Sequence, residues 1–413
     1  MSRYVAFGYV SQVCSIASPG SQKPAPAKAF GFQQGYWLLA SIQATCSGSL
    51  YEPLIDGPPV KDFMKTTKHR LLLGSLLSVV LAGCGGGGGG SSPAALPDTP
   101  PTAAPGPISD SNSNANTGTT APGDASAAEE LAAFNLLNSE RSRCGFGVLA
   151  RNAQLDTAAK SHADYQIINN LLTHVQNAAL YPRGFTGVTP ADRVQAAGYN
   201  NAGGVTDEIV AFSGSASKTG LGAEGVRGLL SAPYHLRGLV SGYREIGLSV
   251  RSSSDLGVST PSVYLQINAA YKAGAGPQPA AATSVNTYPC EGSTGIKRLL
   301  SNETPNPIPN RDLAVNPLGP VVYVGLREGN ILVINSSTMI EVATGRPVAL
   351  RPPVSAQNDP YSPCLEGCFK RHEAYIAADA PVPANSAFQM LITGSNDGVP
   401  FSRTFNFTTG AGN

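Results

Sequence analysis

Residues 152–174, NAQLDTAAKSHADYQIINNLLTH, decide the fold of the first folded part of the chain. Their apolar side chains recur at every third or fourth position, which predicts an amphipathic helix from about Asn152 to Asn170. The apolar face of this helix consists of Leu155, Ala158, Ala159, Ala163 and Ile167. His162 lies within the helix and is interpreted as a packing or surface residue, whereas His174 follows it in a polar segment.

The segments on either side of this helix predict one further helix and two strands. An earlier helix is predicted to begin where Ser126 and Glu129 have the spacing of a capping box, and to end at Cys144. Residues 245–251 and 262–268 alternate between apolar and polar side chains, as half-buried antiparallel strands do. Helices followed by strands predict the α+β fold class.

Residues 128–273 carry a series of short motifs in a fixed order. The motifs are Asn138-x-x-Arg141, Leu155-x-x-Ala158-Ala159-x-x-His162-Ala163, Leu171-Leu172-Thr173-His174, Arg193-x-x-x-x-Gly198-Tyr199, Asp207-Glu208-Ile209, Ser231-Ala232-Pro233-Tyr234-His235 and Glu245-Ile246-Gly247. In this order the series resembles the CAP superfamily of cysteine-rich secretory proteins, antigen 5 and plant pathogenesis-related proteins, and most of all its bacterial branch. The resemblance implies an α-β-α sandwich over residues 128–273.

The resemblance also implies a cleft in which His174, Glu208 and His235 converge, since they match the family's two histidines and one of its glutamates. Two neutral imidazoles and a carboxylate suit Zn²⁺ or another divalent cation, with water in an open position. The same groups could exchange protons as a general acid–base pair. The alternative is that both histidines are buried, hydrogen-bonded residues with a structural role only.

The sequence departs from the family pattern in three places. Asp207 and Ile209 replace the Gly and Asn that flank the family's glutamate, and Leu229 stands where a Trp is usual. The family's second acidic position falls at about Ala232, so one acid of the cleft is missing. This departure favours a weak metal site, and it favours binding over catalysis.

Residues 311–413 form a second predicted domain. Short apolar alternating runs lie at 321–326, 331–334, 374–377, 388–392 and 401–407. Several short strands with turns between them predict an antiparallel β-sandwich. The end of the chain resembles bacterial Ig-like modules, which implies a spacer or adhesion role. Residues 274–310, rich in Ala, Gly, Pro and Asn near both ends, are predicted to be a linker.

Residues 64–84, MKTTKHRLLLGSLLSVVLAGC, have the pattern of an export signal. A basic start precedes an apolar run that is too short to span a bilayer. The last four residues resemble the lipobox of bacterial lipoproteins, which implies a signal peptide over 64–83 and lipidation of Cys84. Gly85 follows instead of Asp, which favours the outer membrane, with the protein facing the periplasm or the cell surface.

Residues 1–63 precede this signal and lack the pattern of a domain. They are predicted to be a misassigned, disordered upstream extension, with translation starting at Met64; the alternative is a genuine extension. Residues 84–127 are mostly Gly, Pro, Ser, Thr, Ala and Asn, and such a segment cannot bury enough surface to offset its ordering entropy. We therefore expect them to be a disordered tether.

Four cysteines follow the tether, and an oxidising compartment favours disulfides between them. Cys364 and Cys368 flank a three-residue loop that a bridge closes easily, which leaves Cys144 to pair with Cys290. The alternative for the later pair is a metal site completed by His372.

Composition narrows the function. The formal net charge is only +1, which excludes a strong field for nucleic acid. No G-x-x-x-x-G-K-[ST] or H-E-x-x-H motif is present, which argues against a P-loop nucleotide enzyme and a zincin protease. The favoured function is an envelope-anchored binding module for a small ligand, lipid, cell-wall fragment or protein. The alternatives are a metal-assisted hydrolase that uses the His/Glu cleft and a purely structural envelope protein.

Overall fold

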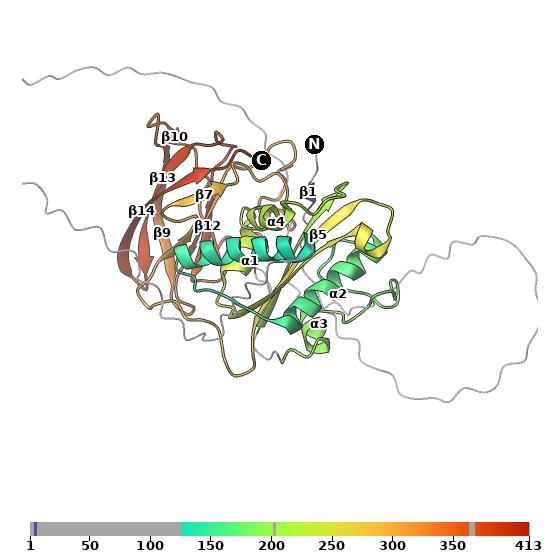
Figure 1. The fold of residues 1–413 in the computed structure, drawn as a ribbon. Helices are drawn as coiled ribbons and strands as arrows, with labels where there is room; N and C mark the ends of the chain where they lie inside the picture. The colour runs from blue at the N-terminus through green and yellow to red at the C-terminus, as the bar shows by residue number, and fades with distance from the viewer. Residues whose placement is uncertain (1–3, 6–124, 201–203, 363–367, 413) are drawn as a thin grey trace, which may run out of the picture. The chain divides into compact units, whose positions relative to one another are not determined.

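The computed structural model describes residues 4–5, 125–200, 204–362 and 368–412, and all of them belong to one compact unit (Figure 1). The predicted signal peptide, Cys84, Cys364 and most of the predicted tether lie outside these ranges, so the predictions about them are untested. Within the described ranges, no helix has both the length and the apolar character needed to cross a membrane.

The first part of the described chain, up to residue 271, is built around one five-stranded sheet. Its strands follow the order β1-β3-β5-β4-β2, and β5 pairs antiparallel with both β3 and β4. The elements are β1 (Tyr4–Val5), α1 (Ala125–Arg143), β2 (Ala150–Arg151), α2 (Ala153–Asn169), α3 (Pro190–Ala196), β3 (Gly204–Ser213), α4 (Leu221–Leu229), α5 (Pro233–Val240), β4 (Glu245–Ser252), a short 3₁₀ helix (Ser253–Leu256) and β5 (Ser262–Tyr271). The predicted α+β class is confirmed.

Helices cover both faces of this sheet. Successive residues of a strand point to opposite faces, and β3 shows the consequence. Ile209 and Ala211 pack with the α2 residues Ala163 and Ile167. Val210 and its neighbours instead pack in the cluster that contains apolar residues of α1, α4 and α5. Two helical layers therefore meet at the strand that carries Asp207 and Glu208.

The helix predicted from Asn152 to Asn170 is confirmed as α2. The Asn152 side chain accepts hydrogen bonds from the backbone of Gln154 and Leu155, and Asn170 ends the helix in the left-handed conformation at φ 52°. The predicted capping box in the preceding helix is wrong. Glu129 does not cap its own helix; its carboxylate accepts the backbone N–H groups of Gly220 and Gly222, at the start of α4.

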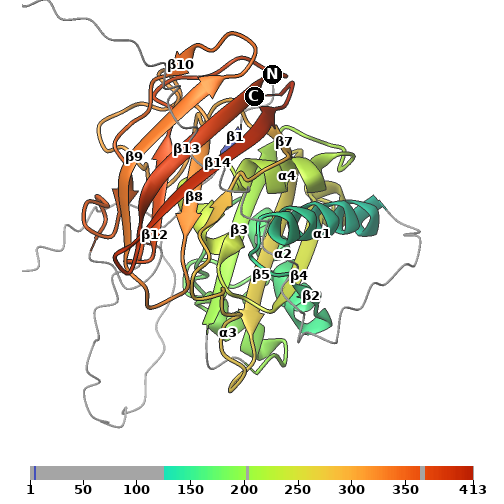
Figure 2. The same cartoon turned by 90° about the vertical axis from the view of Figure 1, so that its left-hand side faces the viewer.

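The later part of the chain contains two further sheets with the orders β10-β9-β13-β14-β7 and β11-β12-β8-β6. Figure 2 shows β9, β13 and β14 side by side, as their antiparallel registers require. The strands are β6 (Asn286–Tyr288), β7 (Ser293–Ile296), β8 (Val321–Gly325), β9 (Leu332–Glu341), β10 (Pro347–Val348), β11 (Val354–Ser355), β12 (Glu373–Ala377), β13 (Ala387–Asn396) and β14 (Val399–Thr409). The prediction of a linker over 274–310 is wrong in its middle, because β6 and β7 belong to these sheets.

A disulfide joins the two parts. Cys144, directly after α1, is bonded to Cys290, two residues after the end of β6, which confirms the predicted pairing. Cys368 is disulfide-bonded too, but Cys364 lies outside the described residues, so a Cys364–Cys368 bridge stays a prediction. The C-terminal sheets are thus covalently tied to the first helix.

Candidate functional site

His174 lies in the segment after α2, where Asp207 of β3 holds its ring. The Nδ1 atom of His174 donates to the Asp207 carboxylate at 3.0 Å. Arg193 of α3 fixes the same segment, since it donates to the carbonyl oxygen of His174 at 3.0 Å. The orientation of the His174 ring is therefore set from two neighbouring elements.

His235 lies in the first turn of α5 and is 4% exposed. Its Nδ1 atom donates to the Glu208 carboxylate at 2.6 Å, and the Thr206 hydroxyl donates to the other oxygen of that carboxylate at 2.6 Å. Gly238 lies directly against Glu208, and a Cβ atom there would collide with the carboxylate. Close approach of α5 to β3 thus depends on this glycine.

The two histidines meet at the edge of the sheet. Asp207 and Glu208 are successive residues of β3, so their side chains leave the strand on opposite faces. Within the described residues, β3 pairs with β5 along its length but with β1 only at Ala211 and Phe212. His174 and His235 therefore approach from the two helical layers around the stretch of this edge that no described strand covers, and their ring centroids are 6.3 Å apart.

Asp207 is buried among one guanidinium group, two imidazole rings and two amide donors. Arg193 forms an ion pair with it at 3.0 Å, and Gln266 and Asn268 of β5 donate to the same carboxylate. Burial by itself raises the pKa of Asp207, but Arg193, His162 and His174 together hold it below its usual value. The carboxylate that orients His174 is therefore charged at neutral pH.

His162 of α2 belongs to the support of the site. It is fully buried, donates from Nε2 to the Thr173 carbonyl at 2.8 Å, and accepts from Gln176 at Nδ1. Burial, reinforced by the charge of Arg193, lowers the pKa of His162 to about 3. The ring is neutral at physiological pH, and both of its nitrogens are used, in agreement with a packing role.

The atoms that remain for a ligand are the Nε2 atoms of the two paired rings. His235 Nε2 is buried and has no hydrogen-bond partner within the described structure. His235 also lines a small cavity of about 80 Å³, whose other walls include Leu229, Ala232 and Leu300. A buried polar atom without a partner is costly, so this atom is the clearest sign of a binding position.

The described residues fit a divalent cation only in part. An imidazole whose Nδ1–H group donates to a carboxylate is the usual form of a histidine ligand, and both His174 and His235 have it. Both oxygens of Glu208 are engaged in hydrogen bonds. Among the described residues, no group of three or more His, Cys, Asp or Glu side chains has an arrangement that could hold a metal ion. His174 and His235 would thus be the protein ligands, and Glu208 would orient one of them.

The C-terminal part reaches this site through α5. Glu303 accepts the backbone N–H of Tyr234 at 2.7 Å, and Asp359 accepts from the Tyr234 hydroxyl at 3.0 Å. Burial raises the pKa of Glu303 well above its usual range. Glu303 therefore places a carboxylate near Ala232, where the second acid of the family pattern is missing. This carboxylate comes from the segment that was predicted to be a linker.

Three supporting residues were not identified as site residues from the sequence: Asp207, Arg193 and Glu303. Asp207 and Arg193 belong to the motifs quoted above, so the sequence could have indicated that they lie near the site. Glu303 carried no local signal, because only the tertiary fold brings it to α5. A second and larger cavity, about 370 Å³ in volume, lies elsewhere and is not lined by His174 or His235.

Comparison with known proteins adds little to this picture. No protein-family model and no curated protein matches the chain. Among solved structures, an extracellular protein containing an SCP domain, from Bacillus anthracis strain Ames, is similar to part of the chain at 22% identity and a TM-score of 0.27. The match covers 36% of this chain and 41% of that one, so it spans less than half of that protein. A likeness at this level carries no argument about function.

Proposed function

We propose that the chain is an extracytoplasmic binding module of the CAP type, and that its ligand binds where His174 and His235 meet. The motif series in residues 128–273 supports the family. The observation that carries the site is the unpartnered Nε2 atom of His235, buried beside a second carboxylate-oriented imidazole. Such a pair suits Zn²⁺ or a similar cation, which would link the protein to a ligand donor atom.

The proposed metal site has two protein nitrogens, with water or the ligand in the remaining positions. Because Asp207 and Glu208 accept from the Nδ1 atoms, the Nε2 lone pairs would be directed to the cation. A site with so few protein ligands is weak and exchangeable. It leaves room for a donor group of a small molecule, a lipid headgroup, a cell-wall fragment or a protein.

Calorimetric titration of Zn²⁺ into the full chain tests this site. We expect the double variant His174→Ala/His235→Ala to lose the binding heat, while His372→Ala, a histidine outside the site, keeps it. Acid should weaken binding, because a protonated imidazole cannot bind a metal. Equal heats from the wild type and the double variant would eliminate the metal site.

A second function, metal-assisted hydrolysis, is supported by the two carboxylate–imidazole pairs, which could accept and return protons. Within the described residues, no Ser or Cys side chain is hydrogen-bonded to either ring. Binding is therefore the better-supported function. Hydrolysis of peptidoglycan or ester substrates that disappears in His235→Ala would reverse this preference.

The anchor is the remaining component of the proposal. The lipobox pattern at 81–84 supports an outer-membrane lipoprotein attached through acyl chains on Cys84. We expect Cys84→Ser to leave an unprocessed precursor that incorporates no labelled palmitate. Normal acylation of this variant would exclude Cys84 as the attachment point.

A further inference from the structure

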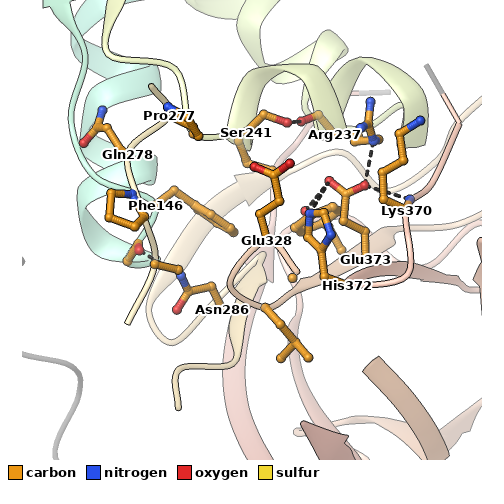
Figure 3. A pocket seen from close by; sticks show the side chains of 18 of the residues that line it. Phe146, Arg237, Ser241, Pro277, Gln278, Asn286, Glu328, Lys370, His372 and Glu373 are labelled. Carbon is orange, nitrogen blue, oxygen red and sulfur yellow. Dashed lines mark hydrogen bonds and ion pairs between the residues drawn. The ribbon is translucent and has the colours of Figure 1, made fainter. Parts of the chain in front are cut away.

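We propose that the larger cavity is a second binding site, separate from the histidine pair, for a small organic anion that carries a carboxylate. The cavity has a volume of about 370 Å³ and is lined by residues of the α1 end, α5, the 277–280 loop, β8 and the segment before β12 (Figure 3). This volume is typical of small-molecule sites. Nothing in the proposed function uses it.

Hydrogen bonds fix the walls of this cavity. The Gln278 side chain donates to the carbonyl oxygens of Val148 and Tyr243 at 2.8 and 2.6 Å. Asn286 donates to the Gly145 carbonyl at 2.8 Å, a few residues from the disulfide. The loop, the α1 end and β6 are thus joined to one another, and the cavity is preformed.

The floor of the cavity contains a satisfied ion pair. Arg237 donates to Glu373 at 2.7 Å, and Glu373 also accepts from the Tyr323 hydroxyl and the Lys370 backbone. The Glu373 carboxylate is therefore fully occupied. It neutralises Arg237 and is not available for a ligand.

Apart from the Arg237–Glu373 pair, the charged residues in and directly behind the cavity wall are predominantly positive. Arg141 is fully buried behind the wall, and it donates to the carbonyl oxygens of Phe146 and Ser241, both of which line the cavity. Its hydrogen-bond partners among the described residues are all carbonyl oxygens, so no described carboxylate neutralises it. Burial lowers its pKa to about 9, which leaves it charged at neutral pH. Lys370 adds a further positive charge to the lining, against the exposed carboxylate of Glu328.

Lys370 is the direct partner that we assign to the anion. Its ammonium group takes part in no hydrogen bond or ion pair with the described residues, whereas Arg244 donates to the carbonyls of Gly276 and Pro277. In Figure 3, the labelled residues Arg237, Lys370 and Glu373 lie on one side of Glu328, and Phe146 and Pro277 lie on the other. A carboxylate with an apolar body fits such a division, because the body can contact the Phe146 ring and the prolines.

The test is calorimetric titration of the full chain with benzoate and with its neutral isostere benzamide. We expect benzoate to bind at least about 10-fold more tightly, and its affinity to fall as salt is added. Lys370→Met should weaken benzoate binding about 5-fold to 10-fold, while Glu328→Gln should strengthen it about 2-fold to 5-fold. Lys160→Met, whose lysine pairs with Asp164 on α2, is the control and should change nothing.

Opposite shifts from the two variants require that both side chains act on the same bound charge. The proposal is overturned if benzoate and benzamide bind equally, if neither binds, or if the two variants shift the affinity in the same direction. Binding of inorganic phosphate without benzoate would overturn the assignment to a carboxylate. Because His174 and His235, the residues proposed to bind zinc, do not line this cavity, this proposal and the proposed function can fail independently.

Discussion

Glu208 illustrates how one carboxylate can control the site without touching a ligand. It holds His235 through a single 2.6 Å hydrogen bond. Glu208→Gln keeps the shape of the side chain but removes its charge, and we expect Zn²⁺ affinity to fall about 10-fold to 100-fold, as for other carboxylates that support a histidine ligand. Glu341→Gln, on β9 and outside the site, is the matched control. Unchanged affinity by titration calorimetry would show that Glu208 does not orient the ligand.

His162 makes folding sensitive to acid. Its pKa is lowered by burial to about 3 in the folded protein, against 6.5 for the unperturbed side chain. The unfolded state therefore binds the extra proton first, and stability that is fully present above pH 6.5 is lost as the pH falls toward 3. Between pH 7 and pH 5 we expect His162 to account for a loss of about 2 kcal/mol.

Denaturant unfolding at several pH values measures this loss. His162→Gln should have a lower free energy of unfolding at pH 7, but its stability should change less than that of the wild type between pH 7 and pH 5. Parallel pH curves for the two proteins would show that another group causes the acid sensitivity. Glu303 provides an internal contrast, because its raised pKa acts with the opposite sign.

At the scale of elements, α5 connects the histidine pair to the C-terminal sheets. His235 contacts Glu208, whereas Arg237, little more than half a turn later, forms a largely buried ion pair with Glu373 at 2.7 Å. Arg237→Met leaves the Glu373 charge buried without its partner, and we expect it to destabilise the protein by about 3 kcal/mol. The double variant Arg237→Met/Glu373→Gln should recover much of this loss. Urea unfolding of all four proteins in the cycle gives the coupling.

The elements also show which features of the fold are predictable from sequence. The helix α2 has an apolar face and both of its caps within its own residues, so local pattern suffices to predict it. The strands β6 and β7 are 3 and 4 residues long and pair with strands far along the chain. Their residues therefore resemble a linker. Glu129 was misassigned for the same reason, since its partners belong to another helix.

For the candidate site too, local motifs predict some features, whereas others depend on the tertiary fold. His174, Glu208 and His235 could be named because they stand in recognisable motifs. Their pairing could not be predicted, since the alternation of β3 sends Asp207 to one histidine and Glu208 to the other. The contribution of Glu303 depends on how the C-terminal part packs on α5. The contact between Glu303 and α5 cannot be predicted from any periodicity in the sequence.

At the scale of the whole molecule, the Cys144–Cys290 bridge closes a loop of 146 residues. A cross-link across a long loop stabilises mainly by limiting the unfolded chain, so we expect Cys144→Ser/Cys290→Ser to lower the free energy of unfolding by about 2–5 kcal/mol. Thermal and denaturant unfolding of the non-reduced proteins measure this difference. A variant as stable as the wild type would show that packing alone holds the two parts together.

The same disulfide determines whether cleavage of the backbone separates the two parts of the protein. Residues 272–275 are exposed and lie between the two bonded cysteines. A single cut there would leave both fragments in one particle, with the histidine pair, α5 and the C-terminal sheets still joined. The nicked protein would migrate as one species on a non-reducing gel and as two after reduction. Cleavage in this loop would therefore leave the two fragments joined until the disulfide is reduced.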